Sequence, residues 1–165
     1  MGKKMPIVGG GDIASILPER DDLLFFASGV SNSQETRESE YQREVDLLLE
    51  QRRDAHIVYF SSLAVIDGVS RYIQHKRSME ARVKLNFALN TIIRIGNIAW
   101  GDNPHTLINH LKNNPEAEIR DEWRYVVDQD ELLHWVDKIP DWSIEMNVPG
   151  RRMKVQQIKE EYCEE

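Results

Sequence analysis

Residues 57–76 read IVYFSSLAVIDGVSRYIQHK and decide the fold. The apolar run Ile57–Phe60 leads into two serines, and a helical stretch begins at Arg71. An unbroken apolar run of this length is typical of a parallel strand covered on both faces, since a strand with one wet face would alternate. The sequence therefore predicts a buried strand followed by a helix.

Similar patterns alternate along the first two-thirds of the chain. Apolar runs that predict strands occupy residues 5–8, 23–27 and 91–95. Amphipathic patterns predict helices over residues 33–53, with a stripe of Tyr41, Val45, Leu48 and Leu49, and over residues 71–86. In the second helix Tyr72, Lys76, Met79 and Val83 share one face. Strands that alternate with helices indicate a parallel α/β sheet.

The last third of the chain has shorter elements. We expect helices over 105–112 and 128–138, strands over 125–127 and 144–148, and a charged C-terminal helix after the Pro149–Gly150 turn. No internal repeat or low-complexity linker interrupts the sequence. We therefore expect one domain over residues 1–165, with a core in 1–101 and a small C-terminal lobe in 102–165.

Composition excludes several classes of partner. The chain has 28 acidic and 21 basic side chains, a formal charge of −7, which disfavours nucleic acid. No stretch approaches the roughly 20 apolar residues of a membrane span. A single cysteine, Cys163, cannot form an internal disulfide, so we expect a reducing cytoplasm. The five histidines show no zinc-site spacing, so we expect no metal.

The glycine cluster Gly9-Gly10-Gly11-Asp12-Ile13-Ala14 follows the first apolar run and precedes a short helical pattern. It fits G-x-G-x-x-A, in which glycines let the backbone approach a pyrophosphate and a following helix N-terminus offers free N–H groups. An ordinary glycine turn between strand and helix explains the same residues.

The pair Tyr72-x-x-x-Lys76 lies within one helical turn. A nearby ammonium favours phenolate, and a tyrosine of lowered pKa can exchange a proton with a substrate hydroxyl while a cofactor takes the hydride. A contact on a solvated helix face is the alternative interpretation.

Taken in order along the chain, these motifs resemble the extended short-chain dehydrogenase/reductase family, the sugar-nucleotide epimerases and dehydratases. The other segments that carry the resemblance are Phe26–Gly29, Val58–Ser62, Glu80 after the tyrosine–lysine pair, Arg94–Gly101 and Arg124–Asp128. The resemblance implies a reduced Rossmann-like parallel sheet flanked by helices. Residues 1–101 would be a shortened dinucleotide-binding core and residues 102–165 a substrate-side lobe.

The resemblance also implies roles for individual residues. Tyr72 would be the catalytic acid/base, Lys76 would lower its pKa and hold the nicotinamide ribose, and Ser62 would orient the substrate hydroxyl. Asn97 and Arg124 would hold the diphosphate of a nucleotide-sugar substrate. The residues expected around NAD or NADP are Gly9, Gly11, Asp12, Ile13, Ala27, Ser28, Gly29, Tyr72 and Lys76. The helices over 33–53 and 71–86 would pair across a two-fold axis in a homodimer.

Three departures from the family pattern bear on activity. Only a short helical pattern separates the glycine cluster from residues 23–27, where the family has the strands that read the adenosine ribose and distinguish NAD from NADP. Leu63 occupies the position of the family's catalytic hydroxyl, and eight residues separate it from Tyr72. Two functions therefore stay open. One is an NAD(P)-dependent oxidoreductase-type epimerase, dehydratase or reductase acting on a nucleotide-activated sugar. The other is a catalytically degenerate module that binds a nucleotide or a protein.

Overall fold

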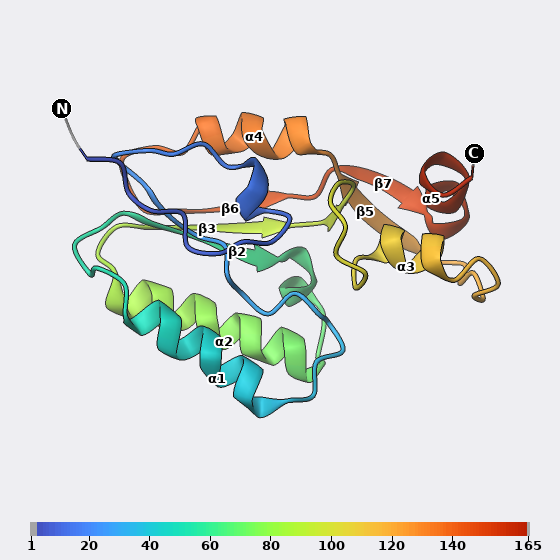
Figure 1. Cartoon of the computed structure of the whole chain (residues 1–165), viewed down its shortest axis with the longest axis horizontal. Coiled ribbons are helices and arrows are strands. Elements are labelled where there is room, and N and C mark those ends of the chain that lie inside the picture. Colours follow the sequence, from blue (N-terminus) through green and yellow to red (C-terminus); the bar gives the residue numbers. More distant parts are fainter. Residues whose placement is uncertain (1–2, 165) are drawn as a thin grey trace.

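The computed structural model describes residues 3–164, and a four-stranded parallel sheet lies at its centre (Figure 1). The strands are β1 (Leu24–Phe26), β2 (Ile57–Ser62), β3 (Asn90–Ile95) and β6 (Ile144–Val148), in the order β1-β2-β3-β6. Every neighbouring pair is parallel. The predicted parallel α/β sheet is confirmed.

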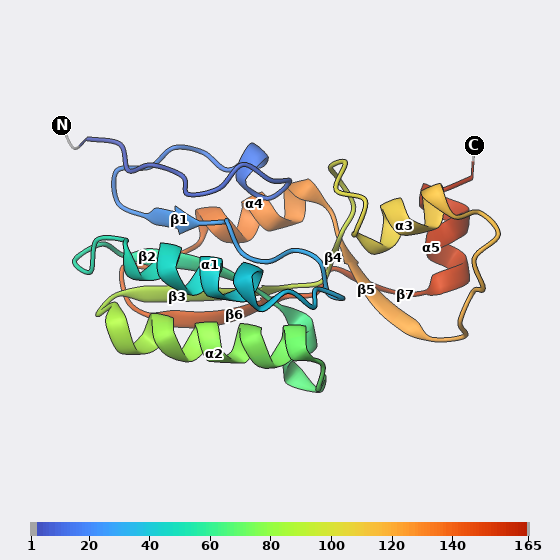
Figure 2. The same cartoon turned by 60° about the horizontal axis from the view of Figure 1, so that its bottom comes forward.

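Helices cover both faces of this sheet (Figures 1 and 2). On one face α1 (Glu38–Leu49) and α2 (Arg71–Asn86) pack on a cluster of Leu24, Phe26, Ile57, Tyr59 and Ile92. On the other face α4 (Gln129–Asp137) and the N-terminal segment pack on Phe25, Val58, Phe60, Ile93 and Ile95. Successive strand residues face opposite layers that are both apolar, and this explains why the strand sequences do not alternate.

A second, smaller sheet forms the C-terminal lobe. It contains β4 (Asn97–Ile98), β5 (Trp123–Val127) and β7 (Arg151–Lys154), in the order β4-β5-β7. Two short helices, α3 (Leu107–Asn113) and α5 (Val155–Tyr162), lie against it. The buried side chains of this lobe are Ile108, Leu111, Val126, Met153, Val155 and Ile158. This small core is separate from the two clusters of the main sheet.

Three expected elements differ from the structure. Residues 5–8 form no strand beyond a single bridge from Val8 to Phe26, because Pro6 has no N–H and the Met5 N–H donates to the Arg20 carbonyl. The first helix begins only at Glu38, after turns in which side chains of Asn32 and Glu35 accept backbone N–H groups.

The segment after Pro149–Gly150 was expected to be helical, and its first four residues are instead β7. Gly150 has a φ of +77° where the chain passes from β6 into β7, and Arg151–Lys154 pair antiparallel with β5. The helix α5 starts only at Val155.

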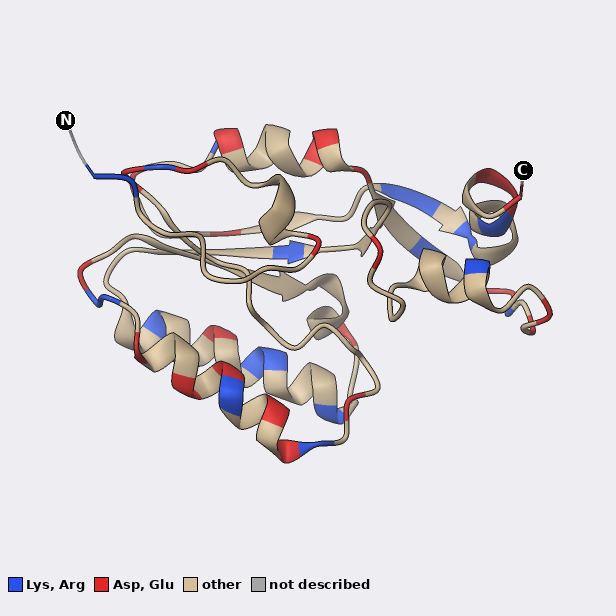
Figure 3. Ribbon diagram, viewed as in Figure 1, with Lys and Arg blue, Asp and Glu red and all other residues tan. Residues whose placement is uncertain are grey.

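Helices α1 and α2 carry charged residues of both signs along their length (Figure 3). Dimerisation through these two helices stays a prediction, and sedimentation that finds only monomer at micromolar concentration would contradict it.

Within residues 3–164 no helix is long and apolar enough to cross a membrane.

Candidate functional site

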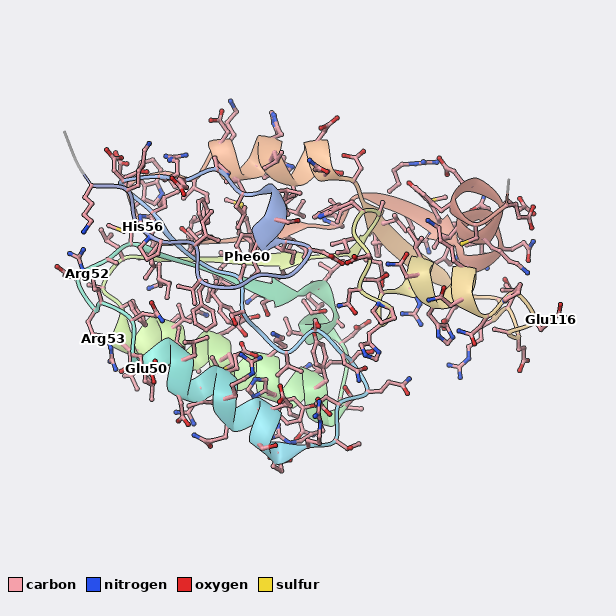
Figure 4. The ribbon with its side chains drawn as sticks, viewed as in Figure 1. Glu50, Arg52, Arg53, His56, Phe60 and Glu116 are labelled. Carbon is pink, nitrogen blue, oxygen red and sulfur yellow. The ribbon has the colours of Figure 1, made fainter. Side chains whose placement is uncertain are left out.

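The parallel strands bring most of the predicted site residues to one edge of the main sheet. In Figure 4 the label His56 marks the amino end of β2, and Phe60 lies toward its carboxyl end. The glycine cluster, residues 27–30, Ser62 and Gly96 all follow strand-like segments at this carboxyl edge. Ligands of open α/β sheets bind outside this edge, which makes it the candidate site.

The glycine cluster forms an open loop. Gly9 has a φ of +127°, and a Cβ there would lie 2.3 Å from the Ala27 carbonyl oxygen, so only glycine fits against β1. At Gly10 and Gly11 nothing lies within 4 Å of a Cβ position. The loop therefore leaves room for a ligand over Gly10 and Gly11.

The short helix expected after this loop is a single 3-10 turn in the structure. Only a three-residue 3-10 turn, Ala14–Ile16, follows, and Ile13 packs its side chain against the core beside it. A long helix dipole therefore does not act at this loop.

Asp12 was expected to contact a cofactor, but its carboxylate binds within the protein. One oxygen accepts the N–H of Asp102 at 3.3 Å and the other accepts the N–H of Asn103 at 3.0 Å. The Asp12 carbonyl accepts the Trp100 indole N–H at 2.9 Å. Gly101, between Trp100 and Asp102, has a φ of +91°, and a Cβ at this position would overlap the Asp12 carboxylate. Asp12 thus fastens the glycine loop to the turn after β4.

Tyr72 and Lys76 share one face of α2, as predicted. The Lys76 nitrogen lies 5.6 Å from the centre of the Tyr72 ring. Burial raises the pKa of Tyr72, and the opposing effect of the Lys76 charge is smaller. The Lys76 charge thus acts to lower the pKa of Tyr72, as the resemblance implies, but burial has the larger effect and the net shift is upward.

The ammonium of Lys76 lies in a buried cluster, since the side chain is only 3% exposed. It donates to Glu44 Oε1 at 3.3 Å and to the Tyr59 hydroxyl oxygen at 3.3 Å. Gly29 lies directly over it, because a Cβ at Gly29 would be 2.5 Å from the Lys76 nitrogen. The charge predicted to hold a ribose is already paired inside the protein.

Glu44 is the centre of this cluster and is 0% exposed. Its carboxylate accepts hydrogen bonds from the Tyr59 hydroxyl at 2.5 Å and from the Val30 N–H at 2.8 Å, and His75 Nε2 lies 2.9 Å from it. Burial acts to raise the pKa of Glu44, but the Lys76 charge and these hydrogen bonds outweigh it. The pKa is held well below the ordinary value.

Glu44 and His75 were not singled out from the sequence. Glu44 lies three residues after Tyr41 and four before Leu48, so it falls on the apolar stripe of α1. A carboxylate on an apolar helix stripe indicates a buried charge that needs a partner, and this was the sequence signal for Glu44.

The remaining residues at the carboxyl edge also bond within the protein. Ser62 Oγ accepts the Ala64 N–H at 3.2 Å and caps a 3-10 turn, Leu63–Ile66. The Ser28 carbonyl and hydroxyl oxygens both accept from Arg43. Ala27 donates its N–H to the Val8 carbonyl at 2.8 Å.

Asn97 and Arg124 lie on adjacent strands of the small sheet. Asn97 Nδ2 donates to the Tyr125 carbonyl at 2.9 Å, and Arg124 forms an ion pair with Glu122 at 2.7 Å. Among residues 3–164, no hydrogen bond or ion pair connects these two side chains with Tyr72, Lys76 or Ser62. In the same range no three metal-ligating side chains converge.

No family model matches this sequence, and no curated protein matches it. Solved structures do share its fold. One of them is UDP-glucose 4-epimerase from Thermotoga maritima, crystallised with UDP-glucose. It matches this chain with a TM-score of 0.63 and 16% sequence identity. The match covers 89% of this chain and 63% of the epimerase chain. UDP-N-acetylglucosamine 4-epimerase from Methanobrevibacter ruminantium, in complex with UDP-N-acetylmuramic acid, has a TM-score of 0.61 and 17% identity. The coverage is 85% of this chain and 59% of that one.

The Bordetella bronchiseptica enzyme WbmG in complex with NAD and UDP superposes with a TM-score of 0.60 at 10% identity. It covers 84% of this chain and 55% of its own. The chain has a Rossmann-like fold. In these three comparisons it spans between 55% and 63% of the solved structure, and the likeness at such low identity is one of fold. The Rossmann-like fold explains why most of the predicted site residues, Asn97 and Arg124 excepted, lie near the carboxyl edge of the main sheet.

Proposed function

We propose that this chain binds a nucleotide-activated sugar and does not carry out dinucleotide-dependent turnover. Of the two functions that the sequence leaves open, this is the second, a catalytically degenerate binding module. The observation that carries the proposal is the pairing of Lys76 with Glu44 beneath Gly29. A lysine held in a buried ion pair is not available to a ribose hydroxyl.

The residues present fit only part of a nicotinamide dinucleotide. The open backbone at Gly10 and Gly11 suits a pyrophosphate. The nicotinamide end has no free ammonium, since Lys76 is paired, and Gly29 covers it. The extended stretch between the 3-10 turn and β1 provides no βα unit beside an adenosine. A dinucleotide therefore does not fit as a tightly bound resident cofactor.

The nucleotide-sugar half of the proposal rests on Arg124 and Asn97. Arg124 is half-exposed, and among residues 3–164 its one ion-pair partner is Glu122, so its guanidinium can turn to a diphosphate. The solved structures with this fold include two crystallised with UDP-linked sugars, which supports this choice of ligand.

Calorimetric titration of the purified protein tests the proposal. UDP-glucose and UDP are expected to bind. NAD and NADP are expected to bind at least a hundredfold more weakly than a dinucleotide binds to a site that makes its full set of contacts. The protein is expected to show no preference between NAD and NADP. The purified protein is expected to carry no dinucleotide. A tightly bound dinucleotide that co-purifies would overturn the proposal.

A turnover function is the second candidate, because Tyr72 and Lys76 keep their adjacency on α2. This function predicts epimerisation or reduction of a UDP-sugar in the presence of NAD(H) or NADP(H). NMR spectra of the sugar measure the reaction. In that case Tyr72→Phe abolishes the reaction, since no phenolic proton remains. Turnover that survives Tyr72→Phe would exclude this mechanism.

A further inference from the structure

The small sheet β4-β5-β7 has one covered face and one open face. Val126 and Met153 point into the lobe core beneath α3 and α5. Trp123 and Tyr125 alternate with Val126 along β5 and so face the other way, where they are 44% and 37% exposed. Arg124 lies between these two aromatic residues on β5, so its side chain is on the opposite face of the sheet. The open face is therefore distinct from the proposed diphosphate contact at Arg124.

Basic side chains lie next to the aromatic rings on this open face. The antiparallel register places Lys154 opposite Trp123 and Arg152 opposite Tyr125. The Arg152 guanidinium carbon lies 4.0 Å from the centre of the Trp123 ring, and the Lys154 nitrogen lies 4.8 Å from it. Stacking on the indole holds the guanidinium plane in place and leaves its N–H edge for an acceptor.

Arg152 differs in its contacts from its basic neighbours Arg151 and Lys154 on β7, a strand rich in basic residues (Figure 3). Arg151 is paired with Glu161 and Lys154 with Asp121. Arg152 takes part in no ion pair or hydrogen bond with any residue from 3 to 164. Within the described residues, Arg152 is therefore an unpaired positive charge on a chain whose formal net charge is −7.

The strand β7 is also the edge of its sheet, since its only neighbour in the described part of the chain is β5. A groove of about 400 Å³ runs beside it. Its lining residues are Arg151, Arg152, Met153, Gln157, Glu160 and Glu161. The outward Lys154 N–H of this edge donates to Gln157 Oε1 at 2.8 Å. The outward N–H and C=O groups of Arg152 have no partner in the sheet, so an added strand can pair there.

We propose that an extended acidic peptide of a partner protein docks along β7 and places a carboxylate on Arg152. The edge supplies main-chain hydrogen bonds, and the stacked guanidinium supplies a bidentate contact for the carboxylate. A nucleotide fits less well, because Arg152 and Lys154 already cover the Trp123 ring on which a base would stack. This site does not depend on the proposed nucleotide-sugar function.

Titration with capped peptides tests the proposal. A peptide of alternating Val and Glu is expected to bind and to change the tryptophan fluorescence, and a Val-Gln peptide of equal length to bind at least tenfold more weakly. Arg152→Gln is expected to weaken the Val-Glu peptide at least tenfold, the scale of one charged hydrogen-bonded pair. Arg82→Gln removes an exposed charge from α2 and is expected to leave binding unchanged.

Two further measurements separate the alternatives. N-methylation of alternate peptide amides is expected to abolish binding, because an added strand needs those N–H groups; unchanged binding would overturn strand addition. Equal binding of the Val-Glu and Val-Gln peptides, or of wild type and Arg152→Gln, would overturn the carboxylate contact. An oligothymidylate that binds more tightly than the acidic peptide and displaces it would assign the face to nucleic acid instead.

Discussion

Replacing Glu44 by alanine is expected to lower the free energy of unfolding by about 3–5 kcal/mol, the cost of removing one partner of a buried ion pair. The change leaves the Lys76 ammonium buried and takes the acceptor from Tyr59, His75 and the Val30 N–H. Urea unfolding followed by circular dichroism measures the loss.

Two variants serve as controls for this experiment. Glu40→Ala on the same helix breaks only an exposed pair with Arg43, so a change below about 1 kcal/mol is expected. The double variant Glu44→Ala/Lys76→Met removes both buried charges and is expected to recover part of the lost stability. A loss below about 1 kcal/mol for Glu44→Ala would mean that the cluster is not a buried ion pair in solution.

The same carboxylate gives a pH dependence of known sign. The folded protein holds the pKa of Glu44 below the ordinary value of 4.5, so the unfolded chain binds this proton more readily. The stabilisation is present above pH 4.5 and is lost as the pH falls below it. Wild type is therefore expected to lose more stability between pH 5 and pH 3 than Glu44→Ala/Lys76→Met. Equal losses in the two proteins would contradict this assignment.

Replacing Arg124 by leucine is expected to weaken UDP-glucose binding by about 1.5–3 kcal/mol, the scale of a hydrogen bond to a charged group. A guanidinium matches two phosphate oxygens at once, and leucine offers no donor. Calorimetric titration of UDP-glucose measures the change.

The matched control is Arg120→Leu, which removes an exposed arginine just before β5. It is expected to leave the affinity unchanged, and both variants are expected to unfold as wild type does, since Arg124 has only its pair with Glu122. Equal affinity in wild type and Arg124→Leu would show that Arg124 does not contact the diphosphate.

The main sheet was predictable because its signals are local. The run Ile57–Phe60 is buried on both faces, and a strand with two apolar layers has a sequence unlike any exposed element. The helix over 71–86 matched in both bounds, since Ser70 caps its first turn and apolar residues recur on one face. β7 was missed, because its charges are typical of a solvated helix and only the turn at Gly150 brings it against β5.

The predicted site could be located but its chemistry could not. Sequence order brings the glycine loop, Ser62 and the Tyr72–Lys76 helix to one edge, as parallel strands require. What each side chain bonds to depends on residues far along the chain. Lys76 meets Glu44 from α1, and Asp12 meets the turn after β4. Charged residues on helices are mostly solvated, so the burial of Glu44 was visible only in three dimensions.

The contact of Asp12 with Asp102 and Asn103 has a consequence for biosynthesis. Residue 12 leaves the ribosome long before residue 103, so the Asp12 carboxylate has no Asp102 or Asn103 N–H donor until residue 103 has been added. Contacts of such sequence separation carry a larger loop-closure cost than local contacts. A nascent chain that stops before residue 102 is therefore expected to expose its glycine loop to proteases, whereas the finished protein protects it.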